Sequence, residues 1–497
     1  MQKFTEVPAL TRYYVNTNVV GGDGSGDSWV NAMPNLTDAL ASADSNTTEI
    51  WVAEGTYNPG SSRSDTFGIG IDNIAIYGGF NGTETALSER NPLTNVTILS
   101  GDLNGDDTGV GFVNTSRYDN SYHVVDLDAN NVIVDGFQIN DGHANGSGTN
   151  AYGGAILVRS TSENFILRNC EINQNIGLTG GAIRSYLDVS TGMTFENCRF
   201  FNNISRYGGG LYFLVNANRT VTLDITNCLF EQNITVDQSS GARGYTGSAA
   251  WIRANASGSN LTSTITNCTF ANNLDRGTQS GSTRGPLGLS RRTDGTSNHT
   301  VTINNSIFYY NDQGVSGATA LMVNNGHTSY PNTTFVNNSI SEDDFSNLIF
   351  LTNTSNSDPL FVDATNGDFT LQSGSPAIDF GDNSFVPAGV TLDLNGNDRI
   401  INGIVDLGSF EFDATLSIPS LSINETVLSP NPAQDAIAIF GLKNTVSLQI
   451  IDILGNSILK KSTYQFGDVD ISDLKSGLYV VVISDGNGAI VKRFIKK

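Results

Sequence analysis

Arginine and aromatic residues recur at fixed positions in five similar segments of the chain. These segments are GGAILVR (153–159), GGAIRSY (180–186), GGGLYFL (208–214), GSAAWIR (247–253) and GPLGLSR (285–291). Within each segment the alternation predicts a strand that has one apolar face and one outward face. The outward residues form two columns, which are Leu157, Arg184, Tyr212, Trp251 and Leu289, and beside them Arg159, Tyr186, Leu214, Arg253 and Arg291.

These columns predict a surface for an acidic polysaccharide. Aromatic faces stack on sugar rings, and guanidinium groups bind carboxylates or sulfates in bidentate fashion. Two longer insertions, 235–246 and 274–284, would bring more such side chains beside the columns, namely Arg243, Tyr245, Arg276 and Arg284. The competing interpretation is that Arg, Tyr and Trp are ordinary residues of an exposed strand.

If the surface is catalytic, the reaction that fits it is polysaccharide β-elimination. Arg184 would neutralise the uronate carboxylate, and Tyr212, Tyr186 or His143 would be the base. Lysine is nearly absent from the long domain, where only Lys3 precedes Lys443, and arginine stays protonated. A glycosidase would need two facing carboxylates, and the predicted columns contain none. A non-catalytic surface adhesin or glycan-binding protein is the alternative, and the sequence leaves the choice open.

Acidic side chains offer a second kind of site. The segment GDLNGDD (101–107) carries Asp102, Asn104 and Asp106 at alternate positions, and calcium prefers such oxygen ligands. Calcium is therefore the one cofactor that the sequence suggests. A solvated turn held by the same side chains is the competing interpretation.

A repeating scaffold must position these residues. The heptads NCEINQN (169–175), NCRFFNN (197–203), NCLFEQN (227–233), NCTFANN (267–273) and NSIFYYN (305–311) share one pattern. Each follows a short alternating run, so two strands meet at an asparagine that tolerates a left-handed backbone. With the glycine-led strand, three strands make one coil of about 28 residues, and coils of this kind must stack to bury their apolar faces.

The four cysteines, Cys170, Cys198, Cys228 and Cys268, all hold the second position of this heptad. A shared structural position predicts free thiols that stack in the core rather than two disulfides.

The coil pattern and the asparagine column at 169, 197, 227, 267 and 305 resemble right-handed parallel β-helices of the pectate-lyase-like superfamily. The resemblance implies an all-β fold and places a substrate groove at the outward columns. The pattern of GGA(I/L) and FxxN also resembles the repeats of chlamydial outer-membrane adhesins. The segments at 357–381 and 392–412 resemble the terminal region of secreted Bacteroidetes β-helix proteins.

The final 80 or so residues change in character. The PNP motif at 430–432, the segment LKSGLYVV (474–481) and the basic end resemble the C-terminal sorting domain of type IX secretion. Alternating strands with Gly and Asn turns predict a small β-sandwich there. We therefore expect four parts, namely an N-terminal capping segment with a helix at 35–43 (1–48), the β-helix (49–356), a terminal capping segment (357–415) and the sorting domain (416–497).

Charge excludes one class of partner. The chain has a net charge of −23, and residues 416–497 carry seven acids and eight bases, which leaves −24 for the rest. So acidic a surface disfavours nucleic acid.

No apolar run is long enough to span a membrane, and MQKFTEVPAL lacks the core of a signal peptide. We expect a secreted or cell-surface monomer whose leader has been removed, and whose partners are an acidic polysaccharide and the type IX machinery.

Overall fold

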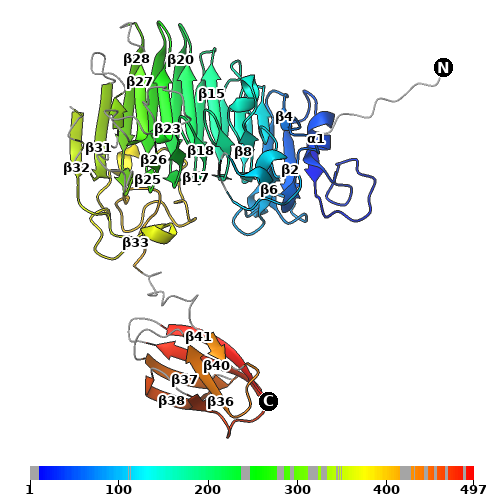
Figure 1. Ribbon diagram of the computed structural model, residues 1–497, viewed down its shortest axis with the longest axis vertical. Helices are drawn as coiled ribbons and strands as arrows, with labels where there is room; N and C mark the ends of the chain where they lie inside the picture. Colours follow the sequence, from blue (N-terminus) through cyan, green and yellow to red (C-terminus); the bar gives the residue numbers. More distant parts are fainter. Residues whose placement is uncertain are drawn as a thin grey trace, which may run out of the picture. The chain divides into compact units, whose positions relative to one another are not determined.

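The computed structural model describes residues 11–109, 111, 113–236, 247–276, 285–291, 296–311, 323–325, 333–342, 345, 348, 350–414, 427–429, 431–440, 446–452, 456–464, 468–484 and 489–497. The chain divides into two compact units, Met1–Phe412 and Asp413–Lys497. Each unit is all-β apart from short helical turns (Figure 1).

The first unit is a parallel β-helix, as the sequence predicts (Figure 1). One sheet has eight parallel strands: β4 (Phe67–Ile69), β7 (Val125–Leu127), β11 (Ile156–Val158), β15 (Ile183–Leu187), β19 (Leu211–Val215), β23 (Gly247–Ala254), β27 (Gly285–Arg291) and β30 (Val323–Asn325). A shorter sheet contains β10 (His143–Ala144), β14 (Ile176–Gly177), β18 (Ile204–Ser205), β22 (Ile234–Thr235) and β26 (Leu274–Asp275).

The largest sheet has 19 strands and bends at the asparagines of the heptads. It comprises β1 (Arg12–Val15), β2 (Glu49–Ala53), β3 (Gly55–Tyr57), β5 (Ala75–Phe80), β6 (Thr97–Ser100), β8 (Ile133–Asp135), β9 (Gln138–Asn140), β12 (Phe165–Arg168), β13 (Glu171–Asn173), β16 (Gly192–Glu196), β17 (Arg199–Phe201), β20 (Thr220–Thr226), β21 (Leu229–Glu231), β24 (Asn260–Thr266), β25 (Thr269–Ala271), β28 (Asn298–Asn304), β29 (Ile307–Tyr309), β31 (Thr333–Ser341) and β32 (Phe350–Ser355).

The heptad asparagines turn the chain at each bend. Asn169, Asn197, Asn227 and Asn267 have φ of 52–53°, in the left-handed region that asparagine tolerates better than most residues. Their side chains form a ladder in which Asn197 Nδ2 donates to Asn169 Oδ1 at 3.2 Å and Asn227 Nδ2 to Asn197 Oδ1 at 2.6 Å. The bend is thus specified by backbone preference and by hydrogen bonds between coils.

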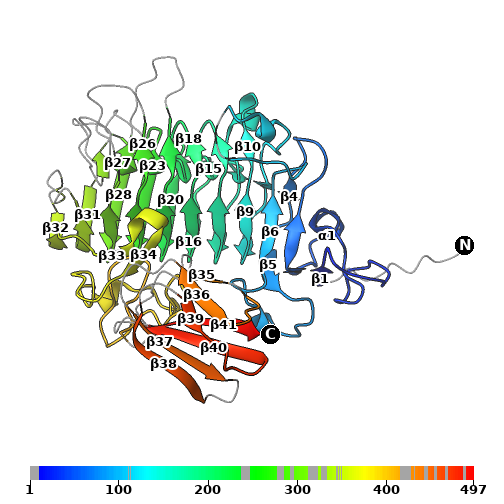
Figure 2. The same ribbon diagram turned by 60° about the horizontal axis from the view of Figure 1, so that its bottom comes forward.

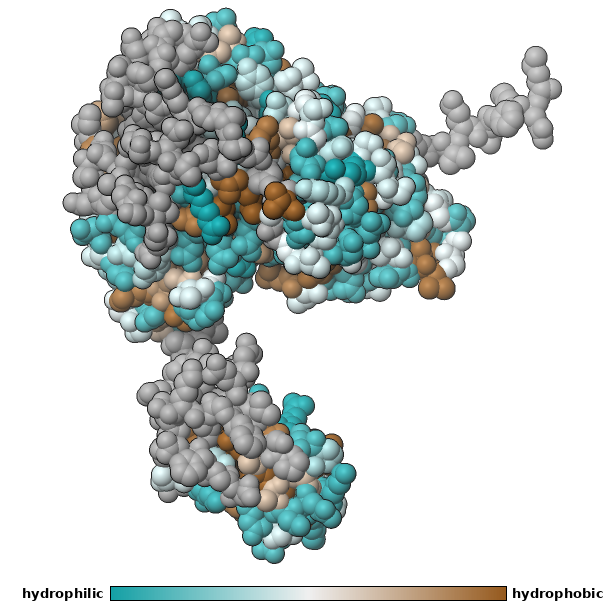
Figure 3. All heavy atoms as spheres, viewed as in Figure 1, coloured by the Kyte–Doolittle hydropathy of each residue, from teal (hydrophilic) through white to brown (hydrophobic). Residues whose placement is uncertain are grey.

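Like side chains stack along the interior. Rings of Phe200, Phe230, Phe270 and Phe308 lie 4.5–4.7 Å apart, centroid to centroid. All four cysteines are free and buried, which confirms the predicted stack of thiols. In the space-filling view hydrophobic residues reach the surface in small groups between hydrophilic ones (Figure 3).

The N-terminal end is capped by the expected helix, α1 (Leu36–Ser42), whose Leu36, Ala39 and Leu40 are buried. The β-helix begins earlier than we expected from the sequence, however. Strand β1 pairs in parallel with β2, with Arg12 opposite Glu49, so residues within the predicted cap already contribute a strand. Short 3-10 turns are η1 (Leu87–Glu89), η2 (Thr115–Tyr118), η3 (Gly148–Ala151), η4 (Ala364–Asn366) and η5 (Asn383–Phe385).

The terminal segment folds back along the β-helix (Figure 2). Its antiparallel strands β33 (Phe361–Asp363) and β34 (Asp368–Leu371) carry Phe361, Phe369 and Leu371 onto outward apolar residues of the large sheet, which are Leu229, Ala271, Ile307 and Ile340. Arg399, fully buried, fixes the segment by donating to Asn227 Oδ1 at 2.8 Å and by pairing with Glu411.

The strands of the second unit pair with one another in antiparallel fashion. One sheet contains β35 (Val427–Ser429), β36 (Ala436–Phe440) and β39 (Asp468–Asp470), and the other β37 (Val446–Asp452), β38 (Ser457–Tyr464), β40 (Gly477–Ser484) and β41 (Ala489–Lys496). Its own buried core includes Ile437, Leu448, Ile450, Val481 and Phe494. No helix among the residues described in either unit is long and apolar enough to span a membrane.

Candidate functional site

The eight-stranded sheet brings most of the predicted outward residues together. Parallel pairing places Arg184 between Leu157 and Tyr212, and Tyr212 next to Trp251. In the neighbouring column Tyr186 pairs with Leu214, and Leu214 with Arg253. The strands therefore present these side chains on consecutive coils.

Two positions in the predicted columns are wrong. Leu289 pairs with Ile252 and is fully buried, and Arg291 pairs with Ala254 instead of Arg253. The register shifts between Gly247 and Ala250, where β23 has one residue more than β27, and a shift of one residue reverses the faces. Arg291 NH1 donates to Ser297 O at 3.0 Å.

Arg184 is the most distinctive side chain of the sheet. Its guanidinium carbon lies 4.7 Å from the ring centroid of Tyr152 and 5.2 Å from that of Tyr186. Its Nε is buried, and among the described residues neither a hydrogen-bond acceptor nor a carboxylate pairs with the side chain. Burial lowers the pKa of Arg184, and the nearby tyrosines oppose that shift.

Aromatic rings extend this surface. Tyr212 and Trp251 meet edge to face at 5.6 Å between centroids, and Tyr207 lies 5.0 Å from Trp251. Arg206 places its guanidinium 5.2 Å from the Tyr207 ring, and its NH2 is buried without a partner among the described residues. We call Tyr152, Arg184, Tyr186, Arg206, Tyr207, Tyr212 and Trp251 the Arg–Tyr patch.

The patch is more enclosed than the flat, exposed surface that the alternation predicts. Trp251 is only 8% exposed, and its Nε1 donates to Ser290 Oγ at 3.1 Å. Leu157 and Leu214 in the same columns are buried. Outward parity therefore does not imply solvent exposure on this sheet.

Arg159 is engaged elsewhere. It forms a bidentate ion pair with Asp126, whose strand β7 precedes β11 in the sheet. Asp126 pairs with Leu157, so the first column does contain a carboxylate, contrary to the sequence-based expectation. Arg243 and Tyr245 lie outside the described residues.

His143 does not join the patch. It lies on β10, in the short sheet, and it is fully buried. Its Nδ1 lies 2.9 Å from Arg117 O, and burial lowers its pKa to about 4. A neutral, enclosed imidazole on another sheet has no access to a substrate bound at Arg184.

The acidic segment forms a cluster of carboxylates. Ligand atoms of Asp102, Asp106 and Asp107 all lie within 4.8 Å of one another, whereas the backbone N of Asn104 donates to Asp119 at 3.2 Å. Asp102 also accepts hydrogen bonds from the backbone of 105–107, as an Asx turn would. Asp107 is the residue that the sequence reasoning missed.

Asp107 sits deeper than its neighbours. Its side chain is 10% exposed and pairs through Oδ2 with Arg117 at 2.8 Å, and Oδ1 is buried with no partner among the described residues. Burial raises its pKa to about 6, although Asn120 and Arg117 act in the opposite direction. An oxygen without a donor, beside two further carboxylates, fits a hard cation such as calcium.

Together the fold and the C-terminal unit define a secreted or cell-surface parallel β-helix protein. The model of the secretion system C-terminal sorting domain matches residues 428–497, which supports the expected interaction with the type IX machinery. A second model, described as a domain of unknown function (DUF5123), matches residues 263–383, the last coils and the start of the terminal segment. No curated protein matches the chain.

Sequence reasoning missed Tyr152, Arg206 and Tyr207. A signal was available, because Tyr152 and Tyr207 each directly precede a glycine pair that opens an outward strand. The two tyrosines and Arg206 lie in the loops before β11 and β19, where strand alternation makes no prediction.

Proposed function

We propose that this protein binds an acidic polysaccharide at the Arg–Tyr patch. Arg184 carries the proposal, because its guanidinium is largely enclosed and has no counter-ion among the described residues. A charge removed from water is costly unless it is paired. A carboxylate or sulfate of a bound glycan would supply the missing acceptor.

The neighbouring groups fit the same ligand. Arg206 offers a second guanidinium without a hydrogen-bond partner at NH2, next to Tyr207. Tyrosine rings present apolar faces to sugar rings and hydroxyl groups to their substituents. Arg159 serves as the internal contrast, because Asp126 already neutralises it.

The groups at the patch favour binding over β-elimination. Burial raises the pKa of Tyr212, with Arg184 and Arg253 opposing the rise, so the phenol is protonated at neutral pH. It would therefore donate a hydrogen bond to the glycan rather than abstract a proton. Polysaccharide lyase activity through Arg184 and Tyr212 is the second candidate, and a non-catalytic adhesin or glycan-binding protein fits the patch better.

The test is calorimetric titration of the purified protein with polygalacturonate, alginate and heparin. Arg184→Ala should weaken binding of the preferred polymer by about 1 kcal/mol or more, because it removes the unpaired cation. Arg184→Lys should recover only part of the affinity, since an ammonium cannot form a bidentate pair. The ultraviolet absorbance of unsaturated products, followed with the same polymers, distinguishes a lyase from a binder.

Arg219→Ala is the matched control. Arg219 lies at the surface of the same unit and pairs with Asp188 at 3.4 Å, with both side chains about half exposed. Its replacement should leave glycan affinity unchanged. If Arg184→Ala also binds as tightly as the unsubstituted protein, the patch is not the glycan site.

We also propose that calcium binds at Asp102, Asp106 and Asp107. The support is twofold: Oδ1 of Asp107 is buried without a partner among the described residues, and ligand atoms of the three carboxylates lie within 4.8 Å of one another. Calcium should raise the melting temperature of the protein, and the effect should weaken below about pH 6 as Asp107 becomes protonated. Asp106→Asn should reduce the shift; an identical shift in that variant would place calcium elsewhere.

A further inference from the structure

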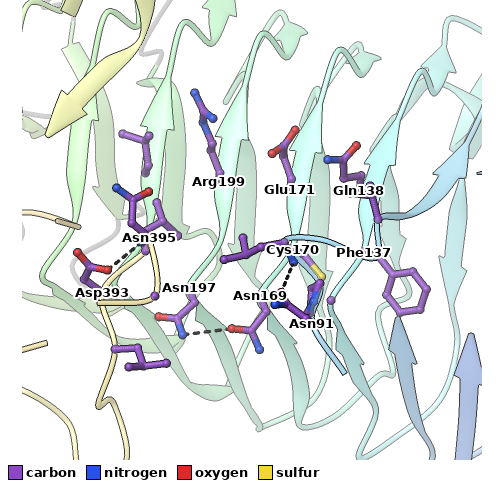
Figure 4. Close-up of a pocket in the computed structure, with 18 of the residues that line it drawn as sticks. Asn91, Phe137, Gln138, Asn169, Cys170, Glu171, Asn197, Arg199, Asp393 and Asn395 are labelled. Atoms are coloured by element: carbon purple, nitrogen blue, oxygen red, sulfur yellow. Dashed lines mark hydrogen bonds between the residues drawn. The ribbon is translucent and has the colours of Figure 1, made fainter. Parts of the chain in front are cut away.

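A hollow lies over the large sheet, on a different face of the coil from the Arg–Tyr patch. It has a volume of about 1270 Å³. One wall comes from the loop at 87–97 and the other from the folded-back terminal segment at 366–370 and 392–396. Its floor is formed by β9, β13 and β17, which carry none of the Arg–Tyr patch (Figure 4). We call it the terminal groove.

Three polar side chains form a row across the floor. Register places Gln138 of β9 opposite Glu171 of β13, and Glu171 opposite Arg199 of β17. Their inward neighbours Ile139, Ile172 and Phe200 are buried, so all three row residues point into the groove (Figure 4). An amide, a carboxylate and a guanidinium thus stand at successive strand spacings of about 4.8 Å.

Glu171 is available to a ligand. Its one hydrogen bond from a described residue comes from Asn173 Nδ2, to Oε1 at 3.3 Å. Burial raises the pKa of Glu171, and Arg199 opposes that rise. The row therefore contains an acceptor that is not fully satisfied by the protein.

The cations of the groove are already neutralised. Arg199 pairs with Glu231, and Arg90 with Asp135 at 2.6 Å. Glu171 and Asp368 add negative charge to the lining. An anionic glycan of the kind proposed for the Arg–Tyr patch would be repelled here.

The floor of the groove does not favour a peptide. It is the face of a sheet whose backbone groups are already paired between coils, so the floor offers no free strand edge for β-augmentation. The amides of Asn169 and Asn197 are engaged in the asparagine ladder, so the groups left for a ligand include the Glu171 carboxylate and the side-chain amides of Asn91 and Asn395. Such groups hydrogen-bond hydroxyls in both directions.

We infer that the terminal groove is a second binding site, specific for a neutral oligosaccharide. Apolar residues of its walls, among them Pro92, Leu93 and Leu394, would cover the carbon-rich faces of the sugar rings. The Gln138–Glu171–Arg199 row forms hydrogen bonds with the sugar hydroxyl groups. This site goes beyond the acidic polysaccharide proposed for the patch, and it neither requires nor contains Arg184.

The experiment titrates the full chain with neutral hexasaccharides of β-linked glucose, mannose, xylose and galactose, and with a hexa-uronate. At least one neutral hexasaccharide should bind. Glu171→Ala should weaken it by about tenfold or more, as expected for loss of a hydrogen bond to a charged group. Gln138→Trp, which fills the floor without changing the charge, should block binding independently.

Glu163→Gln is the matched control, because Glu163 is a partly exposed glutamate near β12 that does not line the groove. It and Arg184→Ala should leave neutral-sugar binding intact, which separates this site from the patch. Melting temperatures of all variants verify that each is folded. The inference is overturned if none of the neutral hexasaccharides binds, if binding survives both groove variants, or if the hexa-uronate is the ligand that the groove variants lose.

Discussion

Replacing Asn233 by Ala should destabilise the β-helix far more than replacing an exposed asparagine of the same fold. Asn233 belongs to a second, internal ladder with Asn175, Asn203, Asn273 and Asn311, in which each amide bonds the next at 3.0–3.1 Å. Asn233 itself is fully buried. Its Nδ2 also donates to Phe200 O at 2.8 Å, and its Oδ1 accepts from the backbone N of Asn203 at 3.2 Å.

The magnitude follows from the groups left without partners. Alanine would leave the Asn203 backbone N–H and one Asn203 amide hydrogen without acceptors, and the Phe200 carbonyl would lose the second of its two hydrogen bonds while keeping the one within the sheet. At roughly 1–2 kcal/mol for each unsatisfied buried group, the free energy of unfolding should fall by about 3 kcal/mol. The Asn273 side chain loses less, because its Oδ1 still accepts from the Asn233 backbone N at 3.1 Å.

Urea unfolding followed by tryptophan fluorescence measures this change without interference from the C-terminal unit. All three tryptophans, Trp29, Trp51 and Trp251, lie in the β-helix unit. Asn298→Ala is the control, because Asn298 is exposed and its side-chain amide donates to Asn260 Oδ1 at 2.9 Å, on the surface of the coil. It should cost less than about 0.5 kcal/mol. Equal effects of the two substitutions would refute the claim that the internal ladder holds the coils together.

Three further outcomes are expected. Cys170, Cys198, Cys228 and Cys268 should react with an alkylating reagent only in denaturant, because they are free and buried, and mass spectrometry would count four labels without prior reduction. Deletion of 413–497 should leave the tryptophan-monitored transition unchanged but retain the protein inside its host, and unimpaired export would contradict the role of the sorting domain. Binding of the acidic polysaccharide should weaken as salt is raised, because screening acts on the Arg184–anion pair, whereas neutral-sugar binding at the terminal groove should be insensitive to salt.

The coil was predictable because its signals are local and repeated. A cysteine, an apolar residue and two asparagines recur at the same heptad positions, and each recurrence reports the same bend and the same inward face. The register between β23 and β27 was not predictable in this way. A single extra residue before Ala250 changes which neighbours Leu289 and Arg291 meet, and the flanking sequences are too divergent to reveal it.

The position and lining of the terminal groove could not be predicted from local pattern. Its residues come from 87–97, 136–138, 169–171, 197–199 and 366–396, together with Leu229 and Phe410, and the folded-back terminal segment brings them together. The sequence does contain one sign that the terminal segment covers the later coils. Outward heptad positions change from Glu171 and Arg199 to Leu229, Thr269 and Ile307, which indicates that later coils lose contact with water.

Whether a carboxylate neutralises an arginine distinguishes the structural arginines of this β-helix from a binding arginine. Residues 1–415 carry a net charge of −24, so carboxylates are plentiful and an arginine that serves the fold finds one, as Arg159, Arg168, Arg199 and Arg399 do. Strand alternation placed both Arg159 and Arg184 on the outward face, but Asp126 neutralises only Arg159. Arg184 is different. Its enclosed guanidinium lies beside tyrosine rings and pairs with no carboxylate among the described residues, even though the unit is acidic. Its positive charge is therefore available to an anionic ligand. That contrast makes Arg184, and not the arginine column as a whole, the residue on which anionic-glycan binding should depend.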